Sequence, residues 1–165
     1  MVTRLRGLKK PIYLISPNKI YSNFYFDLDK VLSSKKVSFF QLRLKKLADN
    51  EIIKIGNKIK PITKKHKVFF LINDSYKIAK KIKADGCHLG QKDGLATNAF
   101  KFLGNKIIGI TCHNSKVFAD KAIKDKATYL AFGSFFKSKL KPNAIKANLK
   151  ILSWVKKKTK IGRAH

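Results

Sequence analysis

The chain alternates short apolar runs with longer segments in which apolar residues recur every three or four positions. Apolar runs of strand length predict six β-strands, at residues 11–16, 37–43, 68–72, 86–89, 107–111 and 129–133. The helical spacing between and after them predicts helices at residues 24–32, 49–62, 75–82, 96–103, 115–124 and 149–155. Short apolar strands separated by helices are typical of a parallel sheet with crossover helices.

The even spacing of these βα units distinguishes between two parallel architectures. No strand has the pattern of an edge strand or a reversal, which favours a closed barrel over an open doubly wound sheet. A TIM (β/α)8 barrel needs eight strands and typically ~200 residues or more. We therefore predict an α/β fold, a TIM barrel truncated to about six βα units, in one domain at 1–160 without strands seven and eight. Residues 161–165 break the pattern, and we interpret them as a non-native tail.

Single residues predict where several helices begin or end. Asp49 and Ser75 are expected to cap the helices that follow them, and Gly104 is expected to stop the helix before it. Pro61 is expected to kink or end the helix that begins near residue 49. The inward face of the helix at 115–124 is predicted to carry Phe118, Ala122 and Ile123.

The charge of the chain is strongly positive, with 38 Lys and Arg against 9 Asp and Glu and a formal net charge of +29. Arg occurs only at positions 4, 6, 43 and 163, and lysines are spread over all the predicted helices. Because readers of nucleic acid favour Arg, we interpret the charge as a solvated lysine surface without a specific nucleic-acid partner. No apolar run has transmembrane length, and Cys87 and Cys112 are expected to be reduced buried thiols. These features predict a cytoplasmic protein without a membrane partner.

Two of the scarce acidic residues follow consecutive predicted strands. Asp74 comes just after the run at 68–72, and Asp93 comes just after the run at 86–90. The carboxyl ends of neighbouring parallel strands meet at one edge of a barrel, where active sites of this fold class form. Two acids at such ends indicate a shared ligand, and the simplest one is a hard cation such as Mg²⁺.

Polar residues at the other strand ends suggest an anionic substrate. Strand alternation places Gln41, Arg43 and Lys45 on one face. A single Arg among many lysines suggests a bidentate grip on phosphate, although a surface ion pair remains the alternative. With the amide of Asn73 and the hydroxyl of Thr111, these residues predict a site for Mg²⁺ and a di- or triphosphate-like anion. The loop after the sixth strand adds Ser138, Lys139 and Lys141.

At these residues the sequence resembles the thiamine phosphate synthase family. The most specific matching segment is Asp85-Gly86-Cys87-His88-Leu89-Gly90-Gln91-Lys92-Asp93. Further matching segments are 13–17, 41–45, 71–74, 109–113 and 129–133. The resemblance implies a TIM barrel that joins hydroxymethylpyrimidine diphosphate to hydroxyethylthiazole phosphate, giving thiamine phosphate and diphosphate.

The resemblance also implies a role for each site residue. Asp74 and Asp93 would hold Mg²⁺, and Arg43 and Lys141 would act in catalysis by stabilising the leaving diphosphate. Ser138 would lie in the loop that meets the thiazole phosphate, although residues 133–138 depart from the family's Gly-Pro-x-x-x-Thr pattern. The residues implied to bind the pyrimidine diphosphate are Gln41, Arg43, Lys45, Asn73, Thr111 and Lys141.

Three alternatives remain at this stage. A thiazole tautomerase relative would share the barrel and a His at the position of His113, but it lacks the Mg²⁺-binding Asp pattern. A basic nucleic-acid-binding protein would show tight, steeply salt-dependent binding to duplex DNA. An inactive fragment is the third. Because strands seven and eight supply the phosphate site in this barrel class, we expect the chain as written to be inactive, with an open edge prone to association.

Overall fold

The chain divides into two compact units in a computed structural model that describes residues 12–136, 146–159 and 161–164. The described residues up to His88 form the N-terminal unit, and those from Leu89 onward form the C-terminal unit. Each unit consists of parallel strands and the helices that connect them.

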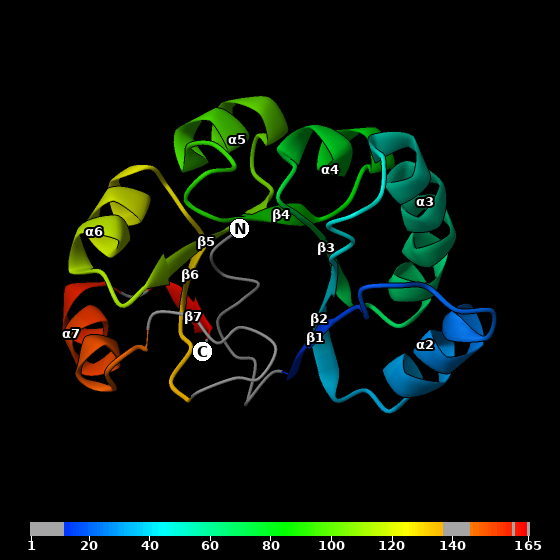
Figure 1. Cartoon of the computed structure of the whole chain (residues 1–165), viewed down its shortest axis with the longest axis horizontal. Helices are drawn as coiled ribbons and strands as arrows, with labels where there is room; N and C mark the ends of the chain where they lie inside the picture. Colours follow the sequence, from blue (N-terminus) through cyan, green and yellow to red (C-terminus); the bar gives the residue numbers. More distant parts are fainter. Residues whose placement is uncertain (1–11, 137–145, 160, 165) are drawn as a thin grey trace. The chain divides into compact units, whose positions relative to one another are not determined.

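In the N-terminal unit, helices follow parallel strands in strict alternation. Neighbouring strands pair in chain order, β1 with β2, β2 with β3 and β3 with β4. The helices α2, α3 and α4 lie on one side of these strands (Figure 1). The elements are β1 (Ile12–Ile15), α2 (Phe24–Ser33), β2 (Val37–Leu42), α3 (Asp49–Lys65), β3 (Phe69–Asn73), α4 (Tyr76–Ile82) and β4 (Gly86–Leu89).

The core of this unit forms where the helices cover the strands. In α2 the residues Phe24, Leu28 and Leu32 are buried, each four positions after the last, as one helical face requires. Gly56 of α3 faces the side chain of Ile82 in α4 so closely that a Cβ at this position would clash with it. A larger residue at position 56 would therefore require the buried Ile82 side chain to shift.

Helix ends in this unit confirm one predicted cap and correct two expectations. Ser75 caps α4, and its Oγ accepts a hydrogen bond from the N–H of Ile78. The expected cap at Asp49 is wrong, because the N-cap is Ala48, whose N–H donates to the Glu51 carboxylate 3.1 Å away. Pro61 does not end α3, which continues to Lys65. Its ring occupies an exposed position, so the loss of one N–H is tolerated there.

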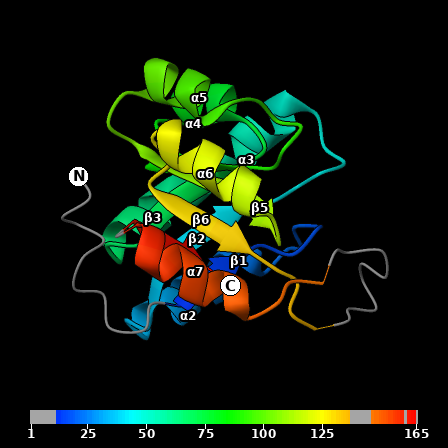
Figure 2. The same ribbon diagram turned by 90° about the vertical axis from the view of Figure 1, so that its left-hand side faces the viewer.

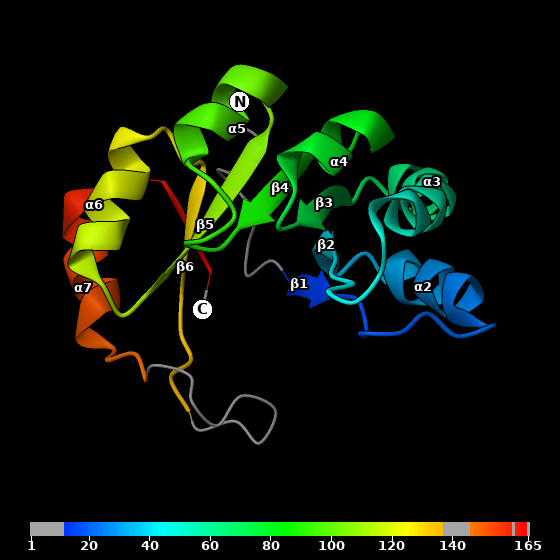
Figure 3. The same cartoon turned by 45° about the horizontal axis from the view of Figure 1, so that its top comes forward.

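In the C-terminal unit, β5 pairs in parallel with β6, and β6 pairs in parallel with β7. Helices α6 and α7 lie side by side over these strands (Figure 2), and α5 lies beside β5 (Figure 3). The elements are α5 (Ala96–Leu103), β5 (Ile107–His113), α6 (Lys116–Lys124), β6 (Tyr129–Phe132), α7 (Lys150–Lys158) and β7 (Gly162–Ala164). Gly104 follows α5 with a φ of 67°, which confirms it as the predicted stop.

Two further expectations are corrected in this unit. The pattern was expected to break after residue 160, but Gly162–Ala164 form a seventh strand along β6. Backbone pairing depends little on side-chain identity, so a short extended segment can join a sheet without an apolar signature. On the inward face predicted for α6, Ala122 is buried as expected and Ile123 is half-buried, but Phe118 is 37% exposed and Ala119 is the second buried residue.

All six strands predicted from the apolar runs are present, with ends shifted by a few residues. The longest helix within the described ranges is α3, with 17 residues and many charges. None of the helices in these ranges combines the length and apolarity needed to cross a membrane.

Candidate active site

The predicted substrate-binding residues of β2 and β3 lie next to one another in the N-terminal unit. Leu42 is in register with Ile72, so the residues that follow each of them lie at the same edge. Gln41 is 3% exposed, and its Nε2 donates to the Oδ1 of Asn73 over 2.8 Å. This bond orients the Asn73 amide with its oxygen toward Gln41 and its nitrogen on the opposite side.

Arg43 is held by two residues that follow β1. The backbone N–H of Arg43 donates to Ser16 Oγ at 2.9 Å, and its Nη1 donates to Asn18 Oδ1 at 3.1 Å. Ser16 is itself buried, and its N–H donates to the carbonyl of Gln41. Sequence reasoning did not identify Ser16 or Asn18, and the signal that could have found them is the polar Ser-Pro-Asn triplet directly after the first strand.

Asp74 adopts a left-handed backbone conformation with a φ of 63°. Asp tolerates this region better than most residues. Its N–H donates to the carbonyl of His88 at 2.8 Å, which ties Asp74 to β4. Lys45 Nζ lies 3.5 Å from Asp74 Oδ2. The structure thus brings Gln41 to Asn73 and Lys45 to Asp74, and Arg43 follows the same end of β2. We call these five predicted residues the rim cluster.

In the C-terminal unit, hydrogen bonds fix Asp93 and Thr111. Asp93 Oδ2 accepts a hydrogen bond from the N–H of Gly90 at 2.8 Å. A Cβ at Gly90 would lie 2.9 Å from that oxygen, so a larger residue there would require the Asp93 carboxylate to shift. The side chain of Gln91 donates through Nε2 to the carbonyl of Thr111, which links the β4–α5 loop to β5.

The remaining predicted residues have different outcomes. Thr111 is half-buried within β5. Ser138 and Lys141 lie outside the described residues. His113 ends β5 with a φ of 51°, and its carbonyl accepts from the N–H of Gly133.

Both cysteines are buried free thiols, as predicted. Burial raises the pKa of Cys87 and of Cys112 to about 12, because a thiolate is poorly solvated there. At neutral pH they remain protonated, which is unsuited to nucleophilic catalysis. Within the described ranges, no three or more His, Cys, Asp or Glu residues come close enough together to hold a metal ion.

A family model described as thiamine monophosphate synthase matches residues 12–163, nearly the whole chain. The chain belongs to the thiamine monophosphate synthase family. Among relatives, it is 59% identical over 154 residues to the thiamine-phosphate synthase of Pelagibacter ubique, covering 93% of this chain and 74% of that protein. It is 39% identical over 148 residues to that of Erythrobacter litoralis, covering 87% and 70%.

A solved structure supports the same assignment at the level of fold. The thiamine phosphate pyrophosphorylase of Pyrococcus furiosus matches with a TM-score of 0.80 and 25% identity, covering 93% of this chain and 73% of that one. This match confirms the predicted fold class, a TIM-type parallel α/β barrel built from βα units. Thiamine-phosphate synthases are transferases, which is the class of the condensation that the resemblance implied.

Proposed function

We propose that this member of the synthase family condenses hydroxymethylpyrimidine diphosphate with hydroxyethylthiazole phosphate. The bond that breaks joins the methylene carbon of the pyrimidine to the diphosphate oxygen, and the electron pair leaves with diphosphate. The bond that forms joins the same carbon to the thiazole nitrogen, which becomes cationic. No proton needs to be removed from either reacting atom, so the site requires anion stabilisation rather than a general base.

The rim cluster is the observation that supports this proposal most strongly. It places an Arg, a Lys, two amides and a carboxylate at the carboxyl ends of neighbouring parallel strands. The Arg43 fork suits two phosphate oxygens at once, and Lys45 adds a second cation. Because the Asn73 oxygen accepts from Gln41, the Asn73 amide nitrogen would serve as a further donor. A leaving diphosphate gains negative charge as the bond breaks, and these groups would stabilise it.

The proposed Mg²⁺ ligands are Asp74 in the N-terminal unit and Asp93 in the C-terminal unit. The donor chemistry of each fits, because carboxylate oxygens are the ligands that Mg²⁺ prefers. Asp93 is oriented by its bond from Gly90, and Asp74 is anchored through its backbone to His88. When bound, Mg²⁺ would supply Lewis-acid neutralisation of the diphosphate.

The roles of Thr111, Lys141 and Ser138 rest on the family resemblance. Thr111 offers a hydroxyl for the pyrimidine diphosphate, and the bond from Gln91 to its carbonyl fixes the backbone at this position. Lys141 would add a cation to the same diphosphate, and Ser138 would contact the thiazole phosphate. The proposed substrates are therefore two small phosphorylated heterocycles, one carrying a diphosphate and one a monophosphate.

A condensation assay tests this function. The chain is incubated with both substrates and MgCl₂, and thiamine phosphate is measured by mass spectrometry together with released diphosphate. We expect equal amounts of the two products, no reaction without Mg²⁺, and strong loss in Asp74→Asn and Asp93→Asn. Asp125→Asn, at the C-cap of α6, is the matched carboxylate control.

The outcomes separate the parts of the proposal. If Asp74→Asn and Asp93→Asn form product as fast as the parent, the assignment of these residues as metal ligands is refuted. Failure to form product and to bind inorganic diphosphate would refute the function. Diphosphate binding without product would support the rim cluster as an anion site and refute condensation by this chain.

A further inference from the structure

The residues that follow β1 contact Arg43 at two separate points. Ser16 accepts a hydrogen bond from the backbone N–H of Arg43 at 2.9 Å. Asn18 accepts one from Nη1, at the far end of the same side chain, at 3.1 Å. These partners lie 27 and 25 residues away in sequence, and the pairing of β1 with β2 brings them beside Arg43.

The two contacts restrict different degrees of freedom. The bond to Ser16 continues the β1–β2 pairing, in which the Ser16 N–H donates to the Gln41 carbonyl, and so fixes the strand end that carries Arg43. The bond to Asn18 restrains the guanidinium, which would otherwise sample many rotamers. Since only one of the several N–H donors of the guanidinium faces Asn18, others are left for phosphate oxygens.

Two features of the sequence make the contacts of Ser16 and Asn18 with Arg43 difficult to replace. Arg43 is the only Arg within the described ranges 12–136 and 146–159, so these ranges offer no second guanidinium. Pro17, between the two partners, has a fixed φ and so limits where Asn18 can lie relative to Ser16.

We propose that Asn18 and Ser16 are positioning residues, which aim the Arg43 guanidinium at the diphosphate before the substrate arrives. The inference rests on the proposed function for the identity of the anion, but the restraint on Arg43 is a property of the chain alone. Neither residue needs to touch substrate. A preorganised donor costs less ordering entropy on binding and stabilises a developing charge more effectively.

The experiment follows the Arg43 side chain by NMR in protein labelled with ¹⁵N-arginine. The chain contains only four Arg residues, so the Nε–Hε spectrum is simple, and Arg43→Lys assigns the Arg43 signal by its loss. The order parameter of this signal is measured first in free protein. Inorganic diphosphate is then titrated with Mg²⁺ present to obtain a dissociation constant.

We expect Asn18→Ala to lower the order parameter of Arg43 and to weaken diphosphate binding by up to about tenfold, as for loss of a hydrogen bond to a charged group. Asn18→Asp keeps the acceptor, so Arg43 should stay ordered even though the added charge weakens diphosphate binding. Asn23→Ala is the matched control, because Asn23 precedes α2 without a side-chain capping bond. It should change neither quantity.

Two results would overturn the inference. One is an Arg43 order parameter in Asn18→Ala equal to that of the parent. The other is equal disorder in Asn18→Asp and Asn18→Ala. Ser16→Ala gives a second readout, because it should speed hydrogen exchange of the Arg43 backbone amide, and unchanged protection there would remove Ser16 from the proposal. A parent protein that makes no thiamine phosphate would defeat the proposed function and leave these measurements valid.

Discussion

Lys45 Nζ lies 3.5 Å from Asp74 Oδ2, and this ion pair joins the end of β2 to the end of β3. The side chains of Lys45 and Asp74 are 54% and 34% exposed, so the pair is of the weak, solvent-screened kind. Under the proposed function each partner has a different role when substrate is bound, Lys45 toward phosphate and Asp74 toward Mg²⁺. The pair would then keep both groups in place and separate at little cost.

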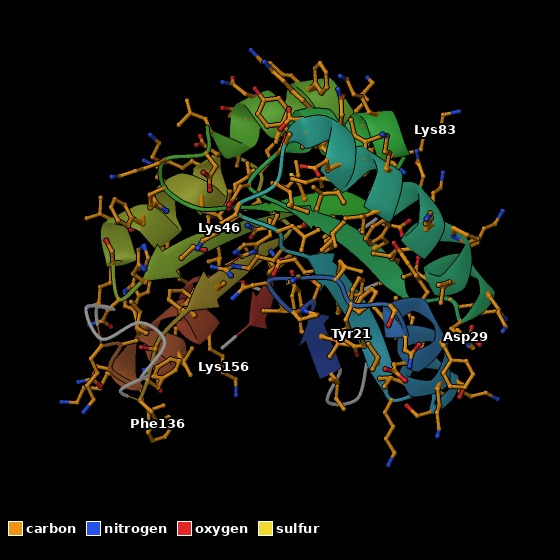
Figure 4. The ribbon with its side chains drawn as sticks, turned by 45° about the vertical axis from the view of Figure 1, so that its right-hand side comes forward. Tyr21, Asp29, Lys46, Lys83, Phe136 and Lys156 are labelled. Atoms are coloured by element: carbon orange, nitrogen blue, oxygen red, sulfur yellow. The ribbon has the colours of Figure 1, made fainter. Side chains whose placement is uncertain are left out.

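Lys45→Met should therefore act in opposite directions on two ligands. Inorganic diphosphate should bind about tenfold more weakly, because a charge-assisted contact is lost. Mg²⁺ alone should bind slightly better, by up to about fivefold, because Asp74 no longer has a competing cation. Isothermal titration calorimetry measures both constants. Lys46→Met, one residue along and exposed (Figure 4), is the control for loss of charge alone. Identical behaviour of the two variants would contradict the assignment of Lys45.

Asp29 should make the N-terminal unit sensitive to acid. Its carboxylate accepts hydrogen bonds from Lys65 at 2.9 Å and contacts His66 Nε2 at 2.8 Å, which joins α2 to the end of α3 (Figure 4). These bonds hold the pKa of Asp29 below its ordinary 3.8. A lowered folded-state pKa gives stability that is present above the unfolded pKa and lost as pH falls through the folded one. The loss should therefore occur below about pH 4.

Urea unfolding at several pH values tests this expectation. The parent should lose stability more steeply between pH 4 and pH 2 than Asp29→Asn does. Asp125→Asn, at the C-cap of α6, should keep the steep dependence of the parent, since no ion pair involves Asp125 within the described ranges. If the free energy of unfolding falls equally between pH 4 and pH 2 in the parent and in Asp29→Asn, this role for Asp29 is ruled out.

The thiols of Cys87 and Cys112 should resist alkylation in the folded chain. Burial raises both pKa values from 9.0 to about 12, which leaves about a thousand times less thiolate at pH 8 than in an unfolded chain. Mass spectrometry after iodoacetamide treatment at pH 8, with and without urea, counts the modified thiols. We expect none to be modified in the folded protein during a period that modifies both in urea. Rapid modification of either thiol without urea would show that it is accessible.

Gly109 and Tyr129 should form a sterically coupled pair on β5 and β6. They are register partners, and a Cβ at Gly109 would overlap the Tyr129 ring. Gly109→Ala should destabilise the fold by about 1–3 kcal/mol through overpacking. In a Tyr129→Leu background the same substitution should cost far less. Chemical denaturation of the two single variants and the double variant gives the coupling, and purely additive effects would contradict this packing.

Much of the fold could be predicted because its strands are buried. A short continuous apolar run such as that of β3, between segments with helical spacing, is typical of a buried strand. The cap at Ser75 follows from local chemistry and was predicted correctly. Of the two outcomes expected at Pro61, a kink or an end of the helix, the end is wrong, because the tolerance of one lost N–H depends on which side of α3 faces solvent. The strand at 162–164 was missed because it is held by backbone pairing, which leaves no side-chain pattern.

The candidate site was predictable to the extent that strand alternation controls it. Gln41, Arg43 and Lys45 occupy alternate positions, and two of them contact residues at the end of β3 as their spacing suggested. The contacts of Arg43 with Ser16 and Asn18 depend on the register between β1 and β2, which sequence alone does not fix. The bond between Gln91 and the Thr111 carbonyl could not be predicted from sequence either, because it depends on the conformation of the β4–α5 loop.

Under the proposed function, the rim cluster is a diphosphate site and Arg43 is its main anion-binding group. The most direct test compares the affinity of parent and Arg43→Lys for inorganic diphosphate in the presence of Mg²⁺. Lys keeps the charge and removes the planar fork, so we expect binding to weaken by about tenfold. Equal affinity in the two proteins would mean that diphosphate binds only the general lysine surface, and that Arg43 is not its binding group.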